Sequence, residues 1–175
     1  MIVRLCRLLL AAALAVASVA GAPAVASEGH RRDKSLQTTG LPLPRFVTLR
    51  SNQVNVRSGP APRYPIEWVF VRKDMPVEIT QEFDTWRRIR DWEGSEGWVH
   101  QSMLSGKRSV IVTGETRTLR SEPRTDAGTV ARAQPGVMGW LLKCNGPWCQ
   151  VDLKGHKGWI QRSEFWGVYP DETIQ

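Results

Sequence analysis

The chain has 175 residues, with 24 Lys or Arg against 17 Asp or Glu, so its formal net charge is +7. This length leaves room for one ordinary domain or two small ones and excludes a larger set of domains. The positive balance favours an anionic partner.

Residues 1–26 are predicted to be a secretory signal peptide. Arg4 and Arg7 precede an apolar, Ala-rich stretch that ends in a small-x-small cleavage pattern at residues 24–26. An uncleaved membrane anchor is the alternative, although the apolar run is short for a stable span. We therefore expect a periplasmic or secreted protein that has no stable membrane span after processing.

Residues 27–44 are predicted to be a disordered lead-in, because they carry many charges and too little apolar surface to offset the entropy of ordering. Beyond them the chain contains an internal duplication. Three features recur in the same order at nearly constant spacing: "NVRSGP" and "TLRSEP" (55–60 and 118–123), Trp86 and Trp148, and "EGWVHQSML" and "KGWIQRSEF" (96–104 and 157–165).

Each copy is predicted to be a small β domain. Short runs of β-branched and aromatic residues alternate with clusters of Gly, Pro, Asn and Asp, a pattern typical of small barrels and sandwiches. We place the first domain at residues 45–106, the second at 107–169 and a short tail at 170–175.

Alternation of side chains along a strand assigns the faces of "WCQVDL" in the second copy. Cys149, Val151 and Leu153 share the side predicted to face the core, and Trp148 lies on the opposite side.

The matching strand of the first copy, "WRRIRD", is less regular. Ile89 points inward together with Arg87 and Asp91, which we expect at the barrel rim. The opposite, outward face carries Trp86, Arg88 and Arg90.

Together these motifs resemble the bacterial SH3-like (SH3b) domain, in which "NVRSGP" is followed by a Trp that opens a strand and then by "GWV" before a turn. The resemblance implies an all-β fold with two small five-stranded SH3-like barrels in tandem. Gly59 and Gly97 would stand at turns or close approaches, while Glu122 in place of Gly59 leaves the first turn of copy two open. The residues that carry the fold motif are Arg57, Gly59, Gly97, Trp98, Arg120, Trp148, Gly158 and Trp159.

Eukaryotic relatives of this class bind proline-rich peptides in an aromatic groove. Trp86 and Trp148 fall in that groove. The places of the groove's proline and last tyrosine are held by His100 and Met103 in copy one and by Gln161 and Glu164 in copy two. Polyproline recognition is therefore not expected, and the resemblance implies cell-wall binding or extracytoplasmic protein contacts instead.

Cys144 and Cys149, in "CNGPWC", are predicted to form a disulfide, because cysteines of exported proteins commonly pair and the turn between them places the sulfurs across a hairpin. A redox motif would more typically be C-x-x-C. A zinc site would need two further ligands, of which His156 offers one. We expect no metal and no cofactor.

Basic residues crowd into the first copy and are either a solvated surface or a patch for an anionic partner. Nucleic acid is not expected, because the chain carries an export signal. Trp68, Trp92 and Trp166 are expected to pack in the core or between the domains. The basic residues are Arg57, Arg63, Arg72, Lys73, Arg87, Arg88 and Arg90.

No catalytic residues are predicted, since neither His100 nor His156 lies in a motif with a nucleophile. We therefore expect a non-enzymatic envelope binding module that recognises peptidoglycan fragments or an extracytoplasmic protein through Trp86, Arg88 and Arg90. One alternative is a structural or regulatory subunit of a cell-envelope enzyme without wall binding of its own, and another is an unrecognised enzyme. The sequence leaves the oligomeric state open.

Overall fold

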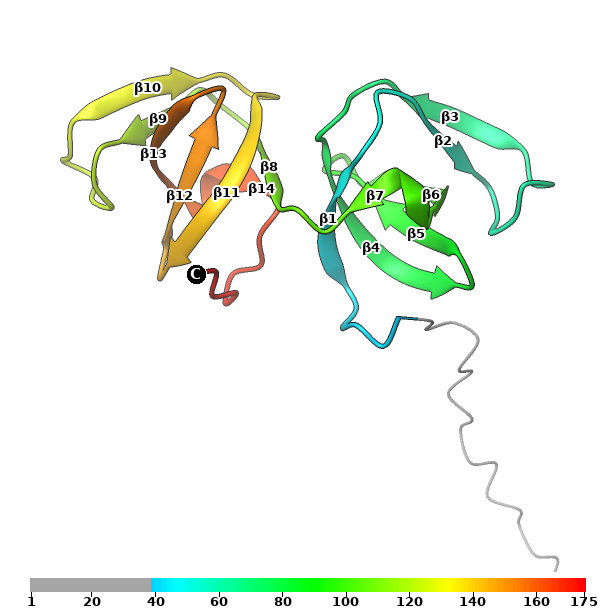
Figure 1. Ribbon diagram of the computed structural model, residues 1–175. Helices are drawn as coiled ribbons and strands as arrows, with labels where there is room; N and C mark the ends of the chain where they lie inside the picture. The colour runs from blue at the N-terminus through cyan, green and yellow to red at the C-terminus, as the bar shows by residue number, and fades with distance from the viewer. Residues whose placement is uncertain (1–38) are drawn as a thin grey trace, which may run out of the picture. The chain divides into compact units, whose positions relative to one another are not determined.

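The computed structural model describes residues 39–175, so the predicted signal peptide lies outside the described residues. The described part forms two antiparallel sheets of seven strands each, and each sheet curls into a small, partly open barrel (Figure 1). Within residues 39–175, no helix has the length and apolar character needed to cross a membrane.

The first barrel contains strands β1 to β7 and one 3₁₀ turn, η2. Its sheet has the order β3-β2-β6-β5-β4-β1-β7. The elements are β1 (Arg45–Leu49), β2 (Val54–Arg57), β3 (Ile66–Phe70), β4 (Pro76–Phe83), β5 (Trp86–Arg90), β6 (Glu96–His100), η2 (Gln101–Met103) and β7 (Leu104–Ser105).

The second barrel repeats this arrangement with the order β10-β9-β13-β12-β11-β8-β14. Its elements are β8 (Ser109–Val112), β9 (Arg117–Arg120), β10 (Thr129–Ala133), β11 (Met138–Asn145), β12 (Trp148–Leu153), β13 (His156–Gln161), η3 (Arg162–Glu164) and β14 (Phe165–Trp166). The predicted tandem of all-β barrels is confirmed. Each barrel has seven strands rather than five, because the hairpin carrying the repeated phrase adds two.

The repeated Arg-Ser phrase closes the long turn of this hairpin in both barrels. Arg57 donates from Nη1 to the carbonyl oxygen of Tyr64 over 2.7 Å, and Arg120 donates in the same way to Ala127 over 3.0 Å. Both arginines reach seven residues ahead, and the backbone hydrogen bonds around them also correspond. The sequence repeats the phrase because the arginine side chain is part of the turn.

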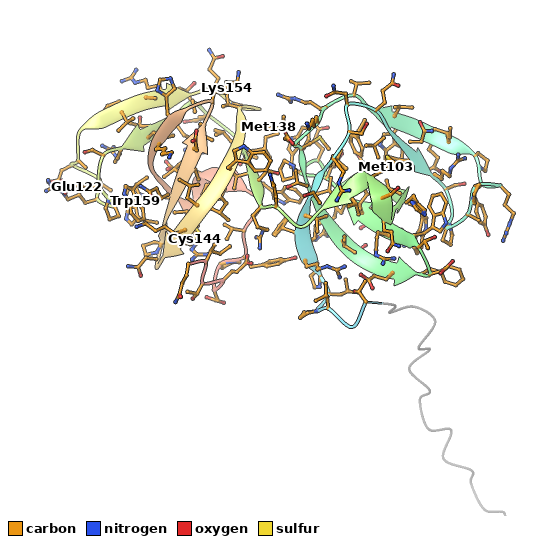
Figure 2. The ribbon with its side chains drawn as sticks, viewed as in Figure 1. Met103, Glu122, Met138, Cys144, Lys154 and Trp159 are labelled. Atoms are coloured by element: carbon orange, nitrogen blue, oxygen red, sulfur yellow. A yellow bond between two sulfur atoms is a disulfide. The ribbon has the colours of Figure 1, made fainter. Side chains whose placement is uncertain are left out.

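Glu122 holds the position in the second barrel that Gly59 holds in the first, and it lies at the margin of that barrel (Figure 2). A Cβ atom on Gly59 would lie 2.6 Å from the ring of Tyr64, so only glycine fits there. The second barrel has Ala127 where the first has Tyr64, and the missing ring leaves room for Glu122. The departure from the family pattern therefore leaves the turn unchanged.

The remaining motif residues fix where the hairpin crosses the sheet. Trp98 on β6 lies opposite Arg57, and Trp159 on β13, which Figure 2 labels, lies opposite Arg120. Gly97 is a close approach, as expected, since its Cβ would stand 2.3 Å from Val56 Cγ1.

Each barrel has its own apolar core. Cys149, Val151 and Leu153 face the core of the second barrel, as the alternation predicts. Cys144 on β11 and Cys149 on β12 are joined by the predicted disulfide. The bond therefore links two neighbouring strands at the end of one hairpin.

The prediction that Arg87 and Asp91 lie at the rim of the first barrel is wrong. Their relative exposures are only 3% and 5%. Asp91 is satisfied inside the β5–β6 turn, where its Oδ1 accepts from the backbone N–H groups of Glu93 and Ser95. Arg87 is satisfied by a buried carboxylate and by backbone carbonyls. Alternation along the strand correctly predicted that Arg87 and Asp91 point inward, but it could not predict the groups that satisfy them there.

The two barrels belong to one compact unit and contact each other. Phe46 on β1 packs edge-to-face on Trp166, with ring centroids 4.7 Å apart, and its ring also contacts Tyr169. The Tyr169 hydroxyl donates to Glu78 Oε1 over 2.7 Å. Burial raises the pKa of Tyr169, and the hydrogen bond to Glu78 raises it further.

We expect each barrel expressed alone to melt well below the tandem. A barrel of about 60 residues buries little apolar surface by itself, and separation removes the contact between Phe46 and Trp166. Trp166→Ala should lower the melting temperature of the tandem more than that of the isolated second barrel. Thermal unfolding followed by circular dichroism measures both effects, and equal melting temperatures for tandem and single barrels would contradict the prediction.

Candidate functional site

Trp86 lies where two surface hollows of the first barrel meet. The larger hollow, of about 460 Å³, is lined by the turn at residues 60–64, by residues 83–86 and by His100. The smaller, of about 310 Å³, is lined by Gln53, Asn55, Arg57, Trp86, His100 and Met103, the last of which lies beside β7 (Figure 2). Trp86 and His100 are thus common to both hollows.

Trp86 lies outside the core cluster of the first barrel, as alternation predicts, but the expectation that it is an exposed aromatic is wrong, because only 9% of the residue is accessible. The ring of His100 packs edge-on against it, with centroids 5.5 Å apart. The turn at residues 60–64 lines the same hollow. Trp86 therefore forms a wall between the two hollows rather than an open platform. Alternation along β5 cannot show this, because the covering groups come from elsewhere in the chain.

Arg88 and Arg90 share the strand with Trp86, but they line neither hollow. Arg88 pairs with Glu96 over 2.9 Å, and both of these side chains are about one-third exposed. Arg90 donates from Nη2 to the buried Glu78 over 2.5 Å, and this hydrogen bond raises the pKa of Arg90. The structure therefore does not bring the three predicted ligand-binding residues together in one hollow.

Tyr64 and Arg63 belong to the larger hollow, and sequence reasoning did not single out Tyr64. The guanidinium of Arg63 lies over the ring of Tyr64, 5.0 Å from its centroid. The available signal was "RYP" (63–65) in the turn that follows the repeated phrase, since the Arg57 hydrogen bond to the Tyr64 carbonyl fixes this turn.

A buried ionic network lies next to Trp86. Glu82 is fully buried on β4 and pairs with Arg45 and Arg87, and Thr39 donates to it from its backbone N–H and its hydroxyl. Burial alone would raise the pKa of Glu82. The hydrogen bonds from Arg45 and Thr39 outweigh this effect and lower the pKa from its ordinary 4.5 to about 2.

The corresponding face of the second barrel is built differently. Trp148 is half-buried, and a hollow of about 330 Å³ beside it is lined by residues 161–163, Pro147, Val168 and Pro170. Arg162 donates to the carbonyl oxygens of Tyr169 and Glu172. The C-terminal segment of the chain therefore forms one wall of this hollow, and the two barrels present different surfaces.

The histidine of the first barrel serves as a cap. His100 Nδ1 lies 2.7 Å from Ser102 Oγ and also accepts from the Ser102 backbone N–H, so that the ring closes the start of η2. Among residues 39–175, no three His, Cys, Asp or Glu side chains gather in a way that could hold a metal ion.

The duplicated barrels, with a Trp opening the strand after a tight turn, define a tandem of small β-barrel domains. The family described as "Bacterial SH3 domain" matches residues 50–106 and 114–167, well over half of the chain. The chain belongs to this family, which confirms the resemblance seen in the sequence.

Similarity to individual proteins is more distant. YrvJ of Bacillus subtilis (strain 168), provisionally named an N-acetylmuramoyl-L-alanine amidase, is 23% identical over 125 residues, which are 65% of this chain and 24% of that protein. This chain thus spans about a quarter of the length of the curated relative it matches.

Two solved structures share a weaker likeness. NlpC1 from Trichomonas vaginalis is 14% identical with a TM-score of 0.35, and the match covers 75% of this chain and 48% of that one. An NlpC/P60 family protein from Bacillus cereus ATCC 10987 is 12% identical with a TM-score of 0.32, over 70% and 57% of the two chains. TM-scores this low support no inference about the present chain.

Proposed function

We propose that this chain is an exported, non-enzymatic module of the cell envelope that binds peptidoglycan fragments through the hollows on either side of Trp86. The observation that supports the proposal is the gathering of Trp86, His100 and Tyr64 around these hollows. Membership of the bacterial SH3 family supports it as well. The relative YrvJ carries the name of an amidase of N-acetylmuramoyl-L-alanine, which is a unit of peptidoglycan.

The residues around the hollows suit a ligand with both sugar and carboxylate groups. The rings of Trp86 and Tyr64 line the larger hollow and supply apolar surface that a sugar can contact. Arg63 places a cation beside them for a peptide carboxylate. Arg88 lies outside both hollows but on the same strand as Trp86, and its partly exposed ion pair with Glu96 is weak enough for a carboxylate of a longer ligand to replace Glu96.

The alternative is a structural or regulatory subunit that contacts another envelope protein. One observation favours it: β3 is an edge strand of its sheet, and Ile66 and Val69 on it, with Val71 just beyond, are exposed. An edge strand with apolar side chains can accept a strand from a partner. This contact would leave the hollows at Trp86 unoccupied, so the two functions are separable by mutation.

Trp86→Ala is expected to abolish retention of the protein on purified sacculi, because the wall common to both hollows is removed. Trp148→Ala is the matched control, since it removes the corresponding Trp of the second barrel, and its retention should equal that of wild type. Co-sedimentation measures retention, and circular dichroism checks that both variants remain folded. Equal retention of wild type and Trp86→Ala would contradict the proposed site, and retention lost only in Trp148→Ala would move the site to the second barrel.

A further inference from the structure

The two barrels use different chemistry at one equivalent pair of positions. Glu82 on β4 lies opposite Arg87 on β5, and Cys144 on β11 lies opposite Cys149 on β12. Each pair joins the two strands of a hairpin near its turn, and the two hairpins are equivalent in the duplicated barrels. The link is a buried ion pair in the first barrel and a disulfide in the second.

Arg87 makes contacts that a disulfide cannot make. Its Nη1 donates to the carbonyl oxygens of Asp84 and Trp86, over 2.7 and 2.8 Å. Its Nη2 donates to Gln101 Oε1 over 2.7 Å. Asp84 lies in the tight turn before β5 and Trp86 is the first residue of β5, whereas Gln101 begins η2. One guanidinium therefore joins these two segments of the first barrel.

These two segments carry the residues that both hollows share. Trp86 closes the tight turn, and His100 directly precedes Gln101 as the cap of η2. The backbone links them as well: Trp86 pairs with His100 across the β5–β6 ladder, and the Gln101 N–H donates to the Thr85 carbonyl over 2.8 Å. The ladder places the two residues opposite each other, and Arg87 adds hydrogen bonds from the buried side to the turn before β5 and to the start of η2.

Arg87 is itself fixed by its surroundings. It is 3% exposed, and its Nε lies 3.2 Å from Glu82 Oε1. Glu82 is held in turn by Arg45 and Thr39. The planar guanidinium keeps its donors in a rigid fork, so a fixed Arg87 fixes the groups that it contacts.

The second barrel shows what happens without this arginine. The residue corresponding to Gln101 is Arg162, which donates to the carbonyl oxygens of Gly146, Tyr169 and Glu172. Two of these acceptors belong to the C-terminal segment. The disulfide holds the hairpin closed, while η3 is fastened to the tail of the chain.

We propose that Arg87 is a positioning residue for the ligand site of the first barrel: it holds the two segments that orient the side chains of Trp86 and His100, which the β5–β6 ladder places opposite each other, and its role goes beyond closing the hairpin. The proposal rests on the function proposed above. A purely structural link at this position would be replaceable by the chemistry that the second barrel uses. A positioning residue would not be replaceable in this way, because a disulfide donates no hydrogen bonds to Asp84, Trp86 or Gln101.

The test replaces the ion pair with a disulfide in the full chain. The double variant Glu82→Cys/Arg87→Cys copies the pair of the second barrel, and mass spectrometry after alkylation shows whether both pairs are oxidised. We expect cooperative unfolding close to that of wild type but loss of most of the retention on purified sacculi. A correctly paired double variant that is retained like wild type would overturn the proposal.

A second variant keeps the test decisive if the four cysteines pair wrongly. Gln101→Ala leaves Glu82 and Arg87 in place and removes the acceptor on η2. We expect a folded protein with weakened retention on sacculi and displaced NMR signals of the Trp86 indole and the His100 ring before any ligand is added. Unchanged signals and unchanged retention would overturn the proposal.

The ligand-free NMR signals separate this proposal from the function on which it rests. If wild type itself is not retained on sacculi, the proposed function fails. The signals of Trp86 and His100 in Gln101→Ala still decide whether the Arg87 network sets their geometry.

Discussion

Replacing Glu82 by glutamine is expected to destabilise the folded chain by about 3–5 kcal/mol at neutral pH, the range typical of removing one partner from a buried ion pair. Glu82 is fully buried between Arg45 and Arg87, and Arg87 is itself buried. The neutral amide would leave the charge of Arg87 uncompensated in the barrel interior. Urea-induced unfolding measures the difference in free energy.

The dependence of stability on pH gives an independent check of the same variant. Folding lowers the pKa of Glu82 from 4.5 to about 2. A lowered pKa contributes stability that is fully present above pH 4.5 and is lost as the pH falls towards 2. Wild type should therefore lose its advantage over Glu82→Gln within this window.

Glu96→Gln is the matched control for Glu82→Gln. Glu96 also pairs with an arginine, Arg88, but at the surface, where such pairs contribute about 0–1 kcal/mol. If Glu82→Gln were no less stable than Glu96→Gln at neutral pH, the buried network would not stabilise the first barrel.

Gly97→Ala is expected to destabilise the first barrel by about 1–3 kcal/mol, the range for extra volume in a well-packed interior. The added Cβ would stand 2.3 Å from Val56 Cγ1 and 3.2 Å from the carbonyl oxygen of Arg57. Val56 is fully buried, so it has no room to move away. The strain falls where β2 crosses β6, and unfolding in urea measures it.

Two other glycines calibrate this prediction. Gly158 is the equivalent position in the second barrel, where the nearest atom to an added Cβ is Leu119 Cβ at 3.0 Å, so Gly158→Ala should have a smaller effect. Gly106 has no atom within 4 Å of an added Cβ, so Gly106→Ala should leave stability nearly unchanged. A Gly97→Ala protein as stable as Gly106→Ala would show that β2 does not approach β6 this closely.

The fold was predictable because its signals are local and written twice. The repeated Arg-Ser phrase predicts the turn that Arg57 and Arg120 close. Alternation in "WCQVDL" predicts the core face of β12, and the spacing of Cys144 and Cys149 predicts their disulfide. The Arg-Ser phrase occurs twice, and the second occurrence reduces the chance of a false match. The exact limits of the lead-in, the two domains and the tail remain predictions.

The candidate site was less predictable, because it depends on contacts between distant segments. Alternation places Arg87 inward, but only the pairing of β4 with β5 brings Glu82 opposite it and makes its burial possible. The same alternation turns Trp86 outward, yet the ring of His100 packs against it and the turn at residues 60–64 faces it across the larger hollow. Pairing with Glu78 and Glu96 across neighbouring strands likewise decides how much of the charge of Arg90 and Arg88 remains for a ligand.

The most direct test of the account is an NMR titration of the full mature protein with soluble muropeptides released from sacculi. The chain contains eight tryptophans, each with an indole N–H signal that can be assigned by single substitutions. The account predicts that the Trp86 indole and the backbone amides of Tyr64 and His100 shift with added muropeptide, while the Trp148 indole does not. The absence of shifts at Trp86, or shifts confined to the second barrel, would contradict it.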